Sequence, residues 1–209
     1  MYRALALPMT IIFLSACSDH QQQRAVEPKP QVSKHSKAFN QSVDSFMDAY
    51  YGLTESFVNW DSVAVGSGAA LLDQRLDNFG HGELKADTSG TQAHAARLVD
   101  DARKDLAAIR SVHNINAQRQ GLNRVTQDLY ALLGAIRYDE KKLYLQQCPM
   151  AFNEKDTGVW ISSYDSIRNP YMGLHHPRYG RAMVECGETR TIMDYGSSPA
   201  EQKANSEKK

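Results

Sequence analysis

The sequence predicts a mainly helical fold, in which an antiparallel four-helix bundle is followed by a loop-rich segment with short β-strands. Between residues 36 and 138, apolar side chains recur at intervals of three and four residues, the period of a helix with one buried face. After residue 138 glycine and proline become frequent, and short runs of β-branched and aromatic residues replace the helical pattern. The links between the helical stretches are short, which favours antiparallel neighbours.

Four stretches make up the predicted bundle. The first carries an apolar stripe over residues 39–57, and the second ends at a glycine-rich turn, residues 80–82. Polar residues that can cap a helix precede the other three: Asp61 for the second, Thr88 or Thr91 for the third, and Asn114 or Asn116 for the fourth. The side chains expected to face inward in the last two helices are Leu98, Ala102, Leu106, Ile109, Leu122, Val125, Leu129, Leu132 and Ile136. Four glycines weaken the individual helix predictions: Gly66, Gly68, Gly121 and Gly134.

The segment 139–193 has a different character. Two short strands are expected at residues 143–145 and 159–161, and the rest is expected to be loop, rich in aromatic residues and sulfur. Loops held on a regular scaffold often carry binding residues, so this segment is the expected place of a functional site, packed on the bundle.

The N-terminus has the anatomy of a secretory signal. Arg3 is followed by an apolar run over residues 4–14 and by small residues, so residues 1–16 are expected to be a signal peptide. The run is too short to span a bilayer as a stable helix. Leu14-Ser15-Ala16-Cys17 resembles the lipobox of bacterial lipoproteins, which implies cleavage before Cys17 and lipid on its thiol. The alternative is an ordinary signal peptide with an incidental cysteine.

These features predict a protein of the cell envelope, held at the membrane by lipid on Cys17 and facing the periplasm. Ser18 follows the lipidated residue, which favours the outer membrane over the inner one. Residues 17–35 are polar and contain two prolines, so they are expected to form a flexible tether, and residues 194–209 a disordered tail.

Charge and motifs exclude several classes of function. The chain has 24 Lys and Arg against 24 Asp and Glu, so it lacks the basic field that holds nucleic acid. It has no nucleophile elbow, no HExxH and no phosphate-binding loop, and we expect that it is not an enzyme.

Two cysteines remain once Cys17 carries lipid, and they allow two interpretations. In an oxidising compartment the pair Cys148 and Cys186 is expected to form a disulfide, unless a metal ion or a reductant claims the thiols. The second interpretation is a soft-metal site. Cys148 and Met150 lie two residues apart, on the same side of an extended stretch, and Met183 and Cys186 lie three apart. Thiolates and thioethers suit Cu(I). Further candidate ligands are Met172, His175 and His176.

Four short motifs stand in order in this segment. They are Cys148-Pro149-Met150-Ala151, Gly158-Val159-Trp160, Asn169-Pro170-Tyr171-Met172-Gly173 and Met183-Val184-Glu185-Cys186-Gly187-Glu188. Together they resemble a domain of unknown function that occurs in small exported bacterial proteins and beside the periplasmic adaptors of Cus-type copper and silver efflux pumps. The resemblance extends over about residues 39–192. The stretch 174–180, which contains both histidines, is longer than the commonest link between the third and the fourth motif in that family.

The resemblance implies a helical bundle closed by the Cys/Met segment, with Cys148, Met150, Met183 and Cys186 as metal ligands. The expected function is an envelope lipoprotein that binds a soft metal ion, Cu(I) before Ag(I) or Zn(II). It would buffer the ion or pass it to a heavy-metal efflux adaptor. The alternative is a structural or interaction lipoprotein, closed by a disulfide between Cys148 and Cys186, that binds another envelope protein.

Overall fold

The computed structural model describes residues 33–86, 90–153 and 155–197. The predicted signal peptide, the lipidation site Cys17, most of the tether and most of the tail lie outside these residues. Within them the chain forms four α-helices, a short 3-10 helix and one three-stranded antiparallel sheet, which confirms the predicted mainly helical fold with β-strands. In this part of the chain, no helix is both long enough and apolar enough to cross a membrane.

The four helices begin and end close to the predicted places. They are α1 (Lys37–Val58), α2 (Ser62–Asp77), α3 (Thr91–Ser111) and α4 (Ile115–Ala135), and the 3-10 helix η1 is His81–Ala86. Asp61 caps α2 and Asn114 caps α4, because each side-chain oxygen accepts two backbone N–H groups of the first turn. Of the two predicted starts for the third helix, the structure has Thr91, after Gly90.

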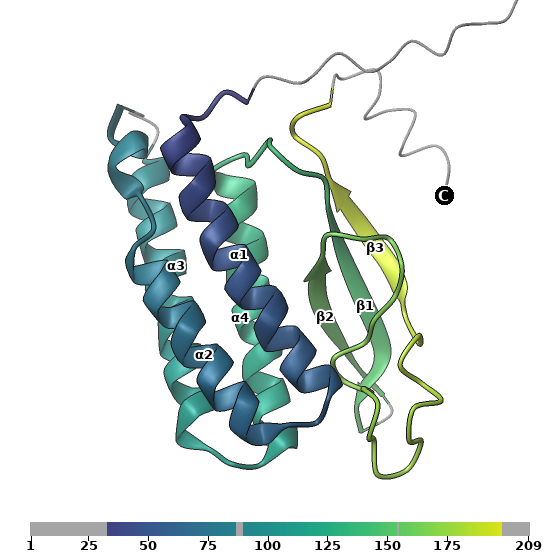
Figure 1. The fold of residues 1–209 in the computed structure, drawn as a ribbon. Helices are drawn as coiled ribbons and strands as arrows, with labels where there is room; N and C mark the ends of the chain where they lie inside the picture. The colour runs from purple at the N-terminus through teal and green to yellow at the C-terminus, as the bar shows by residue number, and fades with distance from the viewer. Residues whose placement is uncertain (1–32, 87–89, 154, 198–209) are drawn as a thin grey trace, which may run out of the picture. The chain divides into compact units, whose positions relative to one another are not determined.

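Each helix packs against the next one in the sequence, and α1 also contacts α4. Figure 1 shows the four helices side by side. Gly121 allows α3 and α4 to approach, since a Cβ atom there would lie 2.4 Å from Ile109 Cγ1. The glycine that weakened the helix prediction is therefore a packing residue. Leu98, which was expected to face inward, is half-buried and packs against the core, and Ala95 and Val99 of the same helix are buried.

The sheet is larger than the sequence predicts. Its strands are β1 (Leu143–Phe152), β2 (Asp156–Ser162) and β3 (Glu188–Met193), and β1 lies in the centre. The expected short strands are longer, and β3 was not predicted. Pro149 lies in the irregular part of β1, between Cys148 and Phe152, where the register with β2 shifts and no backbone N–H is needed. The threonines and arginine of β3 are mostly exposed, so the strand shows no apolar run.

Buried hydrogen bonds join the sheet to the helices. The Tyr50 hydroxyl on α1 accepts the backbone N–H of Ile161 on β2 at 3.0 Å and lies 2.8 Å from the Thr126 hydroxyl on α4. Asn123 on α4 accepts the backbone N–H of Val159. The sheet therefore rests on α1 and α4, as Figure 1 shows, and shares one apolar core with the helices.

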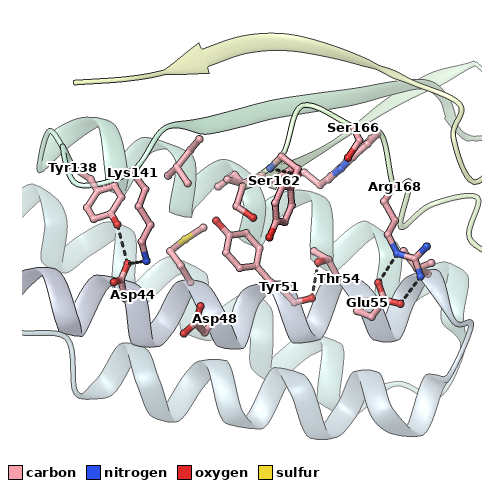
Figure 2. Close-up of a pocket in the computed structure, with 17 residues that line it drawn as sticks. Asp44, Asp48, Tyr51, Thr54, Glu55, Tyr138, Lys141, Ser162, Ser166 and Arg168 are labelled. Atoms are coloured by element: carbon pink, nitrogen blue, oxygen red, sulfur yellow. Dashed lines mark hydrogen bonds and ion pairs between the residues drawn. The ribbon is translucent and has the colours of Figure 1, made fainter. Parts of the chain in front are cut away.

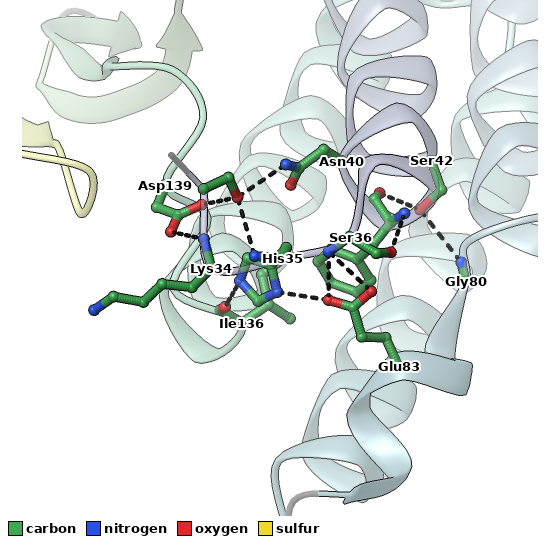
Figure 3. Close-up of polar contacts among 11 residues, drawn as sticks. Lys34, His35, Ser36, Asn40, Ser42, Gly80, Glu83, Ile136 and Asp139 are labelled. Atoms are coloured by element: carbon green, nitrogen blue, oxygen red, sulfur yellow. Dashed lines mark hydrogen bonds and ion pairs between the residues drawn. The ribbon is translucent and has the colours of Figure 1, made fainter. Parts of the chain in front are cut away.

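The last residues of the predicted tether are bound to this folded part. Asp139 accepts the backbone N–H of Lys34, and the two ring nitrogens of His35 lie 3.1 Å from a Glu83 carboxylate oxygen and 2.9 Å from the Ile136 carbonyl oxygen (Figure 3). These contacts fix the start of α1 next to η1 and to the turn after α4.

Candidate functional site

The structure brings the two cysteines together. Cys148 is fully buried on β1, opposite Gly158 of β2, and Cys186 is half-buried just before β3. Burial raises the pKa of Cys186, and the charge of Cys148 and a hydrogen bond with it raise that pKa further. Both are free thiols in the structure. The fold therefore places two soft donors in contact, although 37 residues separate them in the sequence.

Asn169 holds the segment that carries Cys186. Its side chain is fully buried, and its amide donates to the Cys186 carbonyl oxygen at 2.6 Å. Its side-chain oxygen Oδ1 accepts the backbone N–H groups of Tyr171 and Met172. Its backbone N–H donates to the Val184 carbonyl oxygen at 2.8 Å. The asparagine of the third motif is therefore a structural clamp that positions the fourth motif.

Close backbone contact explains two glycines of the motifs. A Cβ atom on Gly187 would lie 2.7 Å from the Gln147 carbonyl oxygen and 2.9 Å from the Trp160 ring. A Cβ atom on Gly158 would lie 2.7 Å from the Tyr171 ring. Only glycine allows these strands and rings to pack so closely around Cys148 and Cys186.

The other predicted ligands are spread around the thiols. Met150 and Met172 line a cavity of about 280 Å³ together with His176, and neither cysteine lines this cavity. Met183 is half-buried against the core, and His175 is exposed. Among the described residues, no three side chains of His, Cys, Asp or Glu gather in a way that could hold a metal ion. A metal site at the thiols would therefore depend on thioether sulfur.

The same cavity contains a buried arginine that the sequence did not indicate. Arg119 on α4 is only 2% exposed, and its guanidinium carbon lies 3.7 Å from the centre of the Trp60 ring. Nε donates to the Pro170 carbonyl oxygen at 3.4 Å, and Nη1 donates to Asn116 Oδ1 at 3.2 Å. Arg119 lies in a helix beside other polar residues. The sequence around it is therefore the same as that expected around a solvent-exposed arginine.

Arg168, in the loop after β2, forms an ion pair with Glu55 of α1. In the structure Arg168 donates to both carboxylate oxygens of Glu55, from Nε at 2.7 Å and from Nη2 at 2.5 Å. Glu188 accepts from the Gln147 side chain at 2.7 Å. The pair with Glu55 is formed because the loop after β2 returns to the last turns of α1.

A second and larger cavity, of about 520 Å³, lies between α1 and the sheet. Figure 2 shows Asp44 with Tyr138 and Lys141 at one end and Glu55 with Arg168 at the other. Burial, helped by the nearby Tyr50 and acidic side chains, raises the pKa of Tyr51 far above its ordinary value, so this phenol stays neutral. The acidic groups at both ends already have cationic partners, so the cavity shows no unmatched charge at its ends.

Comparison with known protein families gives a match to the helical part of the chain. A family model described as "Protein of unknown function (DUF3347)" matches residues 46–141, which is less than half of the chain. The matched range runs from within α1 to just before β1, so Cys148, Cys186 and the four motifs lie outside it. No curated protein and no solved structure matches the chain.

Proposed function

We propose that this protein is an envelope lipoprotein that binds a soft metal ion, with Cu(I) preferred, at Cys148 and Cys186. In this proposal an antiparallel four-helix bundle carries the sheet that holds the site. The observation that supports the proposal is the contact between the two thiols, one on β1 and one before β3. Thiolates bind Cu(I) strongly, and thioethers bind it without adding charge.

Met150 and Met183 complete the proposed donor set. Met150 follows Cys148 by two residues on β1, and the Met183 carbonyl oxygen accepts the Cys186 backbone N–H in a turn. Met172 and His176 are left out of the set, because neither lies on β1 beside Cys148 or in the turn that carries Cys186. Both line the cavity that contains Arg119, to which Met150 also contributes. The ion is proposed as cargo, which the protein buffers or passes to an efflux adaptor.

The protonation of the thiols gives the metal affinity a defined pH dependence. Because burial raises the pKa of Cys186, this thiol keeps its proton at neutral pH, and Cu(I) must displace it. We expect the affinity for Cu(I) to rise with pH, roughly tenfold per pH unit for the proton that Cys186 releases, until Cys186 ionises without metal.

The test is an anaerobic Cu(I) titration of the reduced protein, beginning at Ser18, against a colorimetric chelator at several pH values. Cys148→Ser with Cys186→Ser is expected to abolish stoichiometric binding. Met193→Leu removes a buried sulfur of β3 that is not a proposed ligand, and it is expected to bind like the wild type. Failure of the reduced wild-type protein to compete with a weak chelator would contradict the proposal.

The second candidate function rests on the same contact. If Cys148 and Cys186 form a permanent disulfide, it closes a loop of about 40 residues and stabilises the fold by about 3–4 kcal/mol in the chain-entropy model. The protein would then act through its surface, by binding another envelope protein. A thiol count on protein taken from the oxidising compartment separates the two functions. Two free thiols, or thiols released only when metal is removed, exclude the disulfide.

A further inference from the structure

Arg119 carries a positive charge and has no acidic partner in the part of the chain that the structure describes. Nη2 is buried and has no hydrogen-bond partner among the described residues, and the contacts of Nε and Nη1 are with neutral oxygens. Burial lowers the pKa of Arg119 to about 9, which leaves the guanidinium charged at neutral pH. A buried charge of this kind costs free energy unless a counter-ion is present, and the contact with Trp60 offsets only part of this cost.

The cavity beside Arg119 offers a place for such a counter-ion. Its described lining contains no acidic side chain, and it combines the arginine with the apolar side chains of Met150, Phe152 and Met172. Arg119 also lies near the start of α4, where the helix dipole is positive. Charge and shape therefore favour a ligand with one anionic group and an apolar body.

We infer that the cavity between the start of α4 and the end of β1 binds a small organic carboxylate, whose carboxylate group pairs with the guanidinium of Arg119. A volume of about 280 Å³ is close to that of a ligand with roughly ten non-hydrogen atoms. The apolar body of the ligand would contact the two methionines and Phe152, while Nη2 gains the acceptor that it lacks. Neither cysteine lines the cavity, so the only residue that this site shares with the proposed metal site is Met150.

A carboxylate fits better than phosphate. Arg119 is the one arginine or lysine among the described residues that line the cavity, and a doubly charged, strongly hydrated anion would leave most of its charge unmatched there. The apolar side of the cavity would also contact phosphate oxygens without hydrogen bonds.

The test is calorimetric titration of the full chain, kept in detergent, with benzoate, benzamide and inorganic phosphate. Benzamide has the shape of benzoate without its charge. We expect saturable binding of benzoate with a Kd of about 1 mM, as its size allows. Benzamide is expected to bind at least about tenfold more weakly, because it cannot form the ion pair with Arg119. Equal binding of benzoate and benzamide, or binding of phosphate without binding of benzoate, would overturn the inference.

Variants connect the binding to this cavity. Arg119→Met is expected to abolish the preference for benzoate over benzamide, and Arg119→Lys is expected to keep the preference with weaker binding. Cys148→Ser with Cys186→Ser is expected to bind benzoate like the wild type, so failure of the metal proposal leaves this inference intact. If Arg119→Met does not fold, the comparison of the three probes on the wild-type protein still decides whether the cavity binds a carboxylate. Unchanged benzoate binding in a folded Arg119→Met protein would refute the assignment.

Discussion

Backbone contact at Gly173 ties the end of α1 to the segment after β2. Gly173 has φ +57°, and a Cβ atom there would lie 2.5 Å from the Val58 carbonyl oxygen and 2.6 Å from the Trp60 ring. The next residue, Leu174, donates its backbone N–H to the same Val58 carbonyl oxygen at 2.7 Å. The glycine of the third motif therefore controls where Trp60 lies, and with it the face on which the guanidinium of Arg119 stacks.

A comparison of Gly173 with Gly180 distinguishes the cost of a left-handed backbone conformation from the cost of a steric clash. Gly180 has nearly the same φ, +55°, but a Cβ atom there would meet nothing within 4 Å. Gly180→Ala is expected to cost about 1–2 kcal/mol of unfolding free energy, from the left-handed conformation alone. Gly173→Ala is expected to cost at least about 3 kcal/mol, because it adds the clash. The midpoints of urea unfolding measure both, and equal costs would show that the clash at Gly173 relaxes.

The helices α3 and α4 place like charges side by side. Asp128 on α4 is half-buried, and burial first, then the charges of Asp105 and Asp101 on α3, raise its pKa to about 6. Arg124 lowers that pKa in part, but its closest partner is Asp105, at 2.6 Å. Asp128 is therefore stabilised in its protonated form by the packing of the two helices.

This arrangement predicts that Asp128→Asn raises the free energy of unfolding by an amount that depends on pH. The folded pKa is above the ordinary value of 3.8, so the contribution of Asp128 to stability is fully present below about pH 4 and is lost as the pH rises through 6. After allowance for its partial exposure, the variant is expected to gain about 1 kcal/mol at pH 8, a few degrees in Tm, and nothing at pH 4. Asp100→Asn, on the exposed face of α3, is the control. A gain that is independent of pH would contradict the assignment.

At the scale of the whole molecule, the sheet covers α1 and α4 and carries both proposed sites at one end of the helices. Cys148 and Met150 lie on the central strand, while Arg119 reaches the cavity from the start of α4. The DUF3347 match ends before this strand, at residue 141. The matched helices thus form the support and include Arg119, and the residues after them supply the proposed metal ligands.

The proposed lipid anchor is tested on the complete protein in cells. With labelled palmitate in the medium, the wild-type chain is expected to take up label and to sediment with membranes, because acyl chains on Cys17 hold it there. Cys17→Ser is expected to lose both properties, whereas Cys148→Ser with Cys186→Ser keeps them. An exported wild-type protein without label would show that Leu14-Ser15-Ala16-Cys17 is an ordinary cleavage site.

The sequence by itself determined the four helices and their order, because periodic apolar stripes and capping residues such as Asp61 and Asn114 are local signals. It also indicated the Cys/Met segment as the place to look for a site. Only the tertiary structure decided that Cys148 contacts Cys186 and that Arg119 is buried. It also decided that Met150, Met172 and His176 line the cavity beside Arg119, which neither cysteine lines. Each of these depends on contacts between residues far apart in the chain, and a single sequence carries no local signal for such contacts.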